Sequence, residues 1–255
     1  MADDAAHVHA KRCIEYLGLE VEPVAPVDGE KRADYVARRG QDAYVIEVKG
    51  PGENPAVRAE LLATGHVTTV EAAGRTNSTL GKIRDAVDQL NATPAPDGAF
   101  RIAALVADSR DEDLQTAQYV STLYGKEMLF VLGASGLQGP FDCYYFTFNE
   151  FHRHRTLDAS LILTQDGSRL CPNTFAAGYD RFRSSHLYLL HRQHSALEDP
   201  SEAEAAGTGF ILDADIDRRD ETALLDFVRQ KYSLPAMPFV IRPRQITGRV
   251  LVPDA

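Results

Sequence analysis

The sequence predicts an α/β fold, because segments with the character of buried strands alternate with segments that have helical spacing. The stretch AYVIEVK (43–49) is the strongest strand, and RIAALVAD (101–108) and MLFVLG (128–133) are equally apolar. Apolar residues recur at helical spacing in 5–17, in the segment from Ser78 or Thr79 to about Asn91, and in 111–126. Strands and helices in this order require at least one parallel crossover.

Shorter elements surround the strand at 43–49. The stretch LEVEPVAPV (19–27) contains prolines and suits an edge strand, and 33–37 is expected to be a short strand that carries Asp34. Turn residues separate these segments at 28–29 and at 39–42. Helical character returns at 56–63, after the breaker PGENP at 51–55.

The second half of the chain has a different pattern of expected strands and helices, so we predict a core domain over 1–138 and a C-terminal α+β region over 139–255. This region is expected to contain an aromatic strand at 141–148 and a hairpin at 160–170. A helix is expected at 181–194, an acidic loop at 195–207 and a strand at 209–216. A helix at 221–232 and an extended stretch at 239–252 complete it. Its expected role is substrate specificity or assembly.

Composition narrows the class of protein. The chain has 255 residues, 25% of them charged, and a net charge of −10, which disfavours nucleic-acid binding by bulk electrostatics alone. The arginines are nevertheless clustered, for example at Arg153 and Arg155. No apolar run is long enough for a membrane span, the acidic start lacks a signal sequence, and the three cysteines include no C-x-x-C pair. We therefore expect a cytoplasmic protein without a membrane partner.

Three charged residues form the best functional clue. Glu47 and Lys49 are two apart on an apolar strand and so point to the same face, and Asp34 lies on the preceding short strand. Two carboxylates are the usual protein ligands of Mg²⁺, which activates a water and stabilises charge on a phosphodiester. Lys49 would position or polarise that water, and the carbonyl of Val48 is a candidate further ligand.

Other interpretations remain open. Glu47 and Lys49 could instead form an ordinary surface ion pair. His152 and His154 would share one face of a strand and could ligate a metal, but contact with phosphate, shared with Arg153 and Arg155, explains them better. His7 and His9 open the first helix, where a substrate contact is conceivable.

The segment RADYVA followed by AYVIEVKG resembles the PD-(D/E)xK nuclease superfamily over about residues 5–133. The resemblance implies a restriction-endonuclease-like three-layer core with a central mixed β-sheet. It implies that Asp34 and Glu47 bind the metal, Mg²⁺ or Mn²⁺, and that Lys49 is the motif lysine. Gln89 matches a glutamine that several members carry on the following helix. Ala33 replaces the proline of the motif.

The expected protein is thus a metal-dependent nuclease that cuts the phosphodiester bonds of DNA. Many enzymes of this fold form homodimers, and a homodimer is one arrangement open to this chain. The first alternative is a catalytically inactive nuclease-fold module for binding or assembly in a nucleic-acid-processing or defence complex. The second is a small-molecule hydrolase or toxin-like effector whose active site lies after residue 140.

Overall fold

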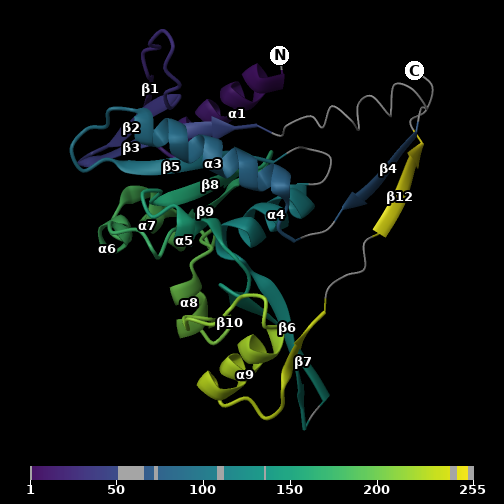
Figure 1. Ribbon diagram of the computed structural model, residues 1–255. Helices are drawn as coiled ribbons and strands as arrows, with labels where there is room; N and C mark the ends of the chain where they lie inside the picture. Colours follow the sequence, from purple (N-terminus) through teal and green to yellow (C-terminus); the bar gives the residue numbers. More distant parts are fainter. Residues whose placement is uncertain are drawn as a thin grey trace.

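The computed structural model describes residues 2–50, 66–71, 74–107, 112–134, 136–241 and 246–251. Within them, a six-stranded mixed sheet has the order β1-β2-β3-β5-β8-β9 (Figure 1). Its strands are β1 (Glu20–Pro23), β2 (Tyr35–Arg39), β3 (Asp42–Lys49), β5 (Phe100–Val106), β8 (Ala159–Leu163) and β9 (Ser168–Pro172). The pairs β3–β5 and β5–β8 are parallel, and the outer pairs are antiparallel. The predicted helix at 56–63 lies outside the described residues.

Helices cover both faces of this sheet. Tyr44, Ile46 and Val48 of β3 pack on the side of α1 (Ala2–Tyr16), whereas Val45 packs on the side of α3 (Asn77–Ala92). This alternation follows from the two-residue period of a strand. The predicted α/β class, with a mixed sheet between helical layers, is therefore confirmed.

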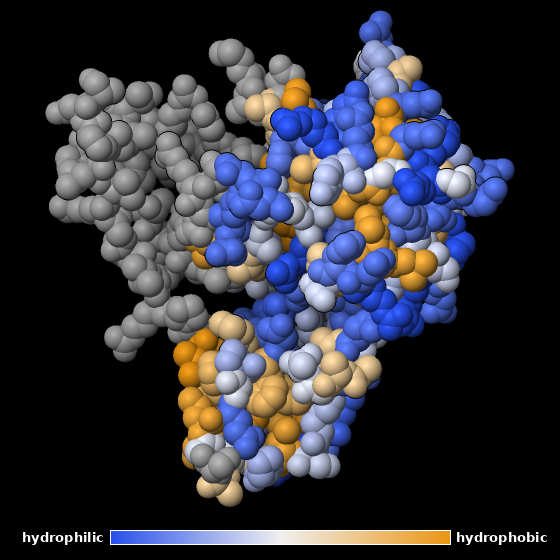
Figure 2. All heavy atoms as spheres, turned by 180° about the vertical axis from the view of Figure 1, so that it is seen from behind, coloured by the Kyte–Doolittle hydropathy of each residue, from blue (hydrophilic) through white to orange (hydrophobic). Residues whose placement is uncertain are grey.

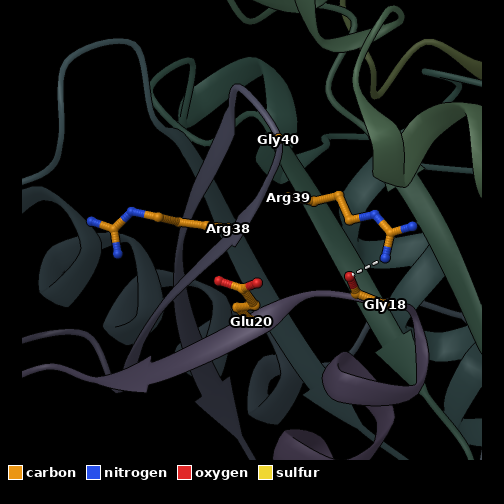
Figure 3. Close-up of a pocket in the computed structure, with 5 residues that line it drawn as sticks. All are labelled: Gly18, Glu20, Arg38, Arg39 and Gly40. Atoms are coloured by element: carbon orange, nitrogen blue, oxygen red, sulfur yellow. Dashed lines mark hydrogen bonds between the residues drawn. The ribbon is translucent and has the colours of Figure 1, made fainter.

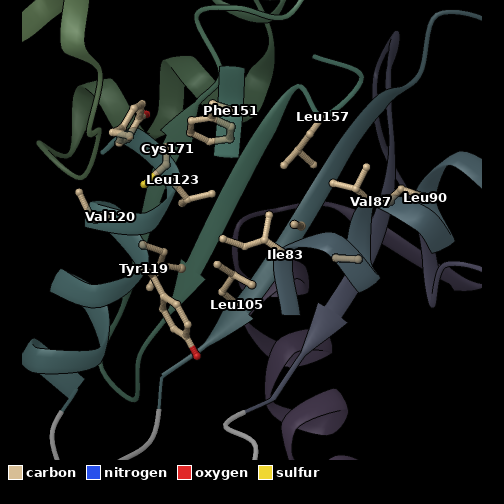
Figure 4. Close-up of a cluster of buried hydrophobic side chains, with 14 of the residues drawn as sticks. Ile83, Val87, Leu90, Leu105, Tyr119, Val120, Leu123, Phe151, Leu157 and Cys171 are labelled. Atoms are coloured by element: carbon tan, nitrogen blue, oxygen red, sulfur yellow. The ribbon is translucent and has the colours of Figure 1, made fainter. Parts of the chain in front are cut away.

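The α3 side holds the larger apolar cluster (Figure 4). Ile83, Val87 and Leu90 recur along one face of α3 and pack over the sheet, as the helical spacing predicted. Tyr119 and Leu123 of α4 (Glu112–Tyr124) join the same cluster. Thr76 caps the start of α3, because its side chain accepts a hydrogen bond from the backbone of Thr79.

A second sheet corrects one expectation. The segment 128–133 was expected to be a buried strand of the core, but β6 (Glu127–Gly133) lies in a different, four-stranded sheet of the described residues. The order of that sheet is β10-β7-β6-β11, with β7 (Gly136–Tyr144), β10 (Gly209–Ile211) and β11 (Pro238–Val240). The predicted domain boundary after residue 138 falls within β7, and β8 and β9, from beyond that boundary, belong to the first sheet.

The second sheet has one covered and one exposed face. Helix α9 (Glu221–Lys231) covers the face that includes Leu129 and Cys143. On the other face, register places Phe239 of β11 opposite Phe130 of β6, and Met128 and Leu132 are exposed beside them. Figure 2 shows hydrophobic side chains gathered on this part of the surface.

The rest of the second half is more helical than expected. The hairpin at 160–170 is confirmed as β8 and β9, but the predicted acidic loop contains α8 (Pro200–Ala205). The helix expected at 181–194 divides into α6 (Tyr179–Phe182) and α7 (His186–Gln193). The HRH segment enters α5 (Glu150–Arg153), so His152 and His154 do not share a strand face. The strands β4 (His66–Glu71) and β12 (Ile246–Leu251) pair antiparallel.

Cys13, Cys143 and Cys171, all described, are free thiols. Among the described residues, no helix combines the length and apolar character that a membrane crossing requires.

Candidate functional site

The hairpin of β2 and β3 brings Asp34 beside Glu47. The ladder pairs Tyr35 with Ile46, so Asp34, directly before β2, stands across from Glu47. The backbone N–H of Asp34 donates to the carbonyl of Ile46 at 3.1 Å. The Oδ2 atom of Asp34 then accepts the N–H of Val48 at 2.7 Å, which fixes the carboxylate at the end of the ladder.

Glu47 and Lys49 form a close pair on the α3 side of β3. Lys49 Nζ lies 2.7 Å from Glu47 Oε1, and the Glu47 side chain is 3% exposed whereas that of Lys49 is 19% exposed. Asp34 keeps 24% of its side chain exposed. The structure therefore brings the three predicted residues together at a place that solvent reaches through Asp34 and Lys49.

Glu47 is unusual because it is a buried carboxyl with an unused oxygen. Its Oε2 atom has no hydrogen-bond partner among the described residues. Burial raises the pKa of Glu47 to about 8, the nearby charge of Asp34 raises it further, and Lys49 lowers it only in part. An unpartnered buried carboxylate is costly, so this atom is suited to receive a cation or a proton.

Helix α1 contributes a fourth residue. His7 Nε2 lies 3.1 Å from Asp34 Oδ1, and the carbonyl of His7 accepts a hydrogen bond from the Tyr35 hydroxyl at 3.5 Å. The sequence had marked His7 only as a conceivable substrate contact. Its contact with Asp34 arises because α1 packs across β3 and its neighbours.

Asp34 and Glu47 offer hard carboxylate oxygens, the donors that Mg²⁺ prefers. The described residues contain no group of three or more His, Cys, Asp or Glu residues suited to hold a metal ion. Mg²⁺ commonly takes one or two carboxylates and completes its shell with waters and substrate. In a strand the N–H and C=O of one residue point to the same side, so the carbonyl of Val48 is directed toward Asp34, as a further ligand would require.

Gln89 is not brought to the three charged residues by any described contact. Its side-chain amide donates to the carbonyl of Asp85, in its own helix, at 3.3 Å. Its backbone is tied to the site through Thr93, whose hydroxyl donates to the Gln89 carbonyl and accepts the N–H of Ala33, each at 2.7 Å. Sequence reasoning missed Thr93, which is buried beside the residue preceding Asp34.

The predicted phosphate-binding residues lie around a different carboxylate. Glu150 is fully buried, and Arg153 and His154 follow it at helical spacing, 3.8 and 3.3 Å from its oxygens. Arg155 is exposed and contacts His152 Nε2 at 3.0 Å. Interpreting this segment as a strand hid Glu150; a helix would have placed it beside Arg153 and His154.

A surface pocket of about 440 Å³ lies elsewhere (Figure 3). It is lined by Gly18, Glu20, Arg38, Arg39 and Gly40. Gly40 belongs to the turn between β2 and β3, whereas Asp34 and Lys49 lie at the other ends of these strands. Arg39, one of the two arginines of the pocket, donates to the Gly18 carbonyl at 2.6 Å and so ties the turn after α1 to the hairpin. The pocket contains none of the predicted catalytic residues.

Comparison with known proteins identifies no relative: no family model, no curated protein and no solved structure matches the chain.

Proposed function

We propose that this protein is a Mg²⁺-dependent nuclease with a restriction-endonuclease-like core that hydrolyses phosphodiester bonds of DNA. The observation that carries the proposal is the buried, unpartnered Oε2 of Glu47 beside the Asp34 carboxylate. Hydrogen bonds from Val48 and His7 leave lone pairs on the oxygens of Asp34, so this carboxylate is still able to bind a metal.

The residues have distinct roles in this proposal. Asp34 and Glu47 would hold the ion with the carbonyl of Val48, and the ion would lower the pKa of a water and stabilise charge on the phosphodiester. Lys49, whose ammonium lies 2.7 Å from Glu47, would orient the attacking water. Gln89 touches the substrate backbone, and Arg153, His154 and Arg155 bind phosphates. Mn²⁺ substitutes for Mg²⁺.

Cleavage tests this directly. Purified protein is incubated with plasmid, single-stranded DNA and RNA in Mg²⁺ or Mn²⁺, and with EDTA as the metal-free control. Glu47→Gln and Lys49→Met should each lower the rate at least about 100-fold. Glu22→Gln and Lys11→Met change the same charges at exposed sites and should cut like the wild type. Equal cleavage by all four variants would exclude this site.

Ion binding offers a test that needs no substrate. Mn²⁺ should raise the melting temperature of the wild type, because a ligand that binds only the folded state stabilises it. Asp34→Asn and Glu47→Gln should lose the increase. An increase that survives in both variants would mean that Mn²⁺ binds elsewhere.

A second candidate is an inactive binding or assembly module of the same fold. It is favoured by the fact that both oxygens of Asp34 already have protein partners, His7 and Val48, so the carboxylate also suits a purely structural role. This candidate predicts no cleavage and no stabilisation by Mn²⁺. The homodimer is a separate expectation, which the mass in solution by light scattering would decide.

A further inference from the structure

Glu150 lies at the centre of a basic cluster drawn from separate parts of the chain. Arg75, just before α3, reaches its Oε1 at 2.9 Å. Arg84 of α3 approaches Oε2 to 3.8 Å, and Arg153 and His154 approach from α5 and the residue after it. Burial would raise the pKa of Glu150, but His154, Arg153 and Arg75 outweigh that effect and lower it, so the carboxyl stays ionised.

The cluster has more positive charge than Glu150 neutralises. One carboxylate offsets one of three guanidinium groups, and His154 adds a further basic site. Arg84 and Arg153 stay 3.8 Å from the carboxylate, beyond hydrogen-bond distance, so Glu150 does not use their N–H donors. Both side chains are exposed. In a chain with a net charge of −10, this surplus is a local feature suited to an anionic partner.

An aromatic ring lies within the same surface. Phe148 is 39% exposed, and the guanidinium groups of Arg153 and Arg219 each lie 6.0 Å from its ring centroid. Arg153 belongs to α5 and Arg219 to the loop before α9, so the ring has guanidinium groups from two separate parts of the chain beside it. The next residue, Asn149, caps α5 by accepting the N–H of His152, which holds the backbone beside Phe148 in place.

Together these groups form a surface, here called the Phe148 surface, defined by Arg75, Arg84, Phe148, Arg153 and Arg219. We propose that it binds a single-stranded stretch of nucleic acid, with phosphates on the arginines and a base stacked on Phe148. Guanidinium groups bind phosphate through paired N–H donors. An exposed ring stacks any base that is not already paired, which a duplex does not offer.

This inference deepens the proposed function, and its link to cleavage rests on that function. It makes single-stranded or locally opened nucleic acid the preferred substrate of the Asp34 site. Glu150 serves as a positioning residue, because its carboxylate gathers arginines from α3 and α5 that would otherwise repel one another.

The test is binding without catalysis. Fluorescence anisotropy with a labelled oligothymidylate, and with a duplex of mixed sequence, is measured in EDTA over a range of salt. Arg84→Gln with Arg153→Gln should weaken single-strand binding at least about tenfold and reduce the salt slope by about 0.7 for each phosphate that the variant no longer binds. Phe148→Leu should weaken single-strand binding about tenfold and leave duplex binding unchanged. Phe148→Trp, which keeps an aromatic ring, should retain single-strand binding.

Controls separate this inference from the catalytic one. Arg38→Gln with Arg192→Gln removes two arginines from exposed ion pairs elsewhere and should bind like the wild type. Glu47→Gln should also bind like the wild type, so loss of cleavage in that variant concerns the metal site alone. No binding by the wild type, equal binding by the Phe148-surface variants, or a preference for duplex would overturn the inference even if the protein cleaves DNA.

Discussion

The Oδ2 atom of Asp34 accepts the backbone N–H of Val48 at 2.7 Å, in the place that a strand neighbour's carbonyl would otherwise occupy. The ladder between β2 and β3 ends at Tyr35 and Ile46, so this side chain continues the pairing by one residue. The bond places one carboxylate beside the buried carboxyl of Glu47. The proposed cation site therefore depends on the way in which the hairpin ends.

The stability of the metal-free protein should depend on pH through Glu47. Its folded pKa, about 8, lies above the ordinary value of 4.5, so the stability it contributes is present below the ordinary pKa and lost as pH rises through about 8. Glu47→Gln does not titrate there. In EDTA, the free energy of unfolding of the variant should therefore rise relative to that of the wild type, by on the order of a few kcal/mol, between about pH 5 and about pH 9.

Urea unfolding of both proteins at several pH values measures this difference. Saturating Mn²⁺ should flatten the wild-type dependence, because a cation favours the ionised carboxylate. Parallel pH curves for the two proteins in EDTA would contradict a raised pKa.

Thr93→Val should disturb the site from a distance. The substitution keeps the shape of the side chain but removes the hydroxyl that accepts the N–H of Ala33, so that donor loses its partner in a buried position. We expect a loss of about 1–3 kcal/mol in the free energy of unfolding. Because Asp34 follows Ala33, affinity for Mn²⁺ should also fall, and calorimetric titration measures it.

Gln89→Ala is the matched comparison for this prediction. It keeps the Gln89 carbonyl that Thr93 uses and removes only the side-chain amide. If Gln89→Ala and Thr93→Val weaken Mn²⁺ binding equally, the effect of Thr93 is not transmitted through Ala33.

Asn173 should prove essential to the α5 segment. This fully buried side chain donates to the carbonyls of Phe151, His154 and Leu157 at 3.2, 3.1 and 2.8 Å, and its oxygen accepts the N–H of Phe175. Asn173→Ala removes these four bonds, although the His154 carbonyl keeps the N–H of Leu157, and should cost about 2–4 kcal/mol of unfolding free energy. Denaturant melts measure the cost.

The same substitution should weaken the binding of single-stranded nucleic acid by the Phe148 surface, because Arg153 and His154 belong to the segment that Asn173 holds. Asn149→Ala, which removes the cap of α5 but none of these bonds, should cost only about 1 kcal/mol. A smaller effect for Asn173→Ala than for Asn149→Ala would contradict the assigned role.

Gly125 should resist substitution because of its place between α4 and β6. It has φ of +60°, and a Cβ here would collide with the carbonyl oxygen of Thr147. Its own carbonyl accepts the N–H of Thr147 at 3.0 Å, which joins the two segments. The left-handed backbone alone would cost an alanine about 1–2 kcal/mol, and the collision with Thr147 adds to this cost. Gly125→Ala should therefore lower the free energy of unfolding by more than that amount, as thermal or urea unfolding would measure.

Gly29 provides the comparison, since it also has positive φ but has no atom near an added Cβ. Gly29→Ala should cost only the strain of the left-handed conformation. Equal losses at both positions would show that the contact with Thr147 relaxes freely.

Local sequence determined much of the first half of the fold. The two-residue alternation around 43–49 predicted which side chains face each way, and the helical spacing after Thr79 predicted the buried face of α3, because these periods follow from backbone geometry alone. The grouping of Asp34, Glu47 and Lys49 was also predictable, since a short hairpin connects them.

Tertiary structure decided what local pattern left open. The segment 128–133 is as apolar as a core strand, yet it lies in another sheet, between β7, which follows it directly, and β11, which comes from far along the chain. Apolar character alone does not report which strands will pair. The Glu150 cluster unites Arg75, Arg84 and Arg153, up to 78 residues apart, and no sequence period reports such a distance. Burial also turned Glu47 from an ordinary acid into one with a pKa of about 8, because the packing around it removes water.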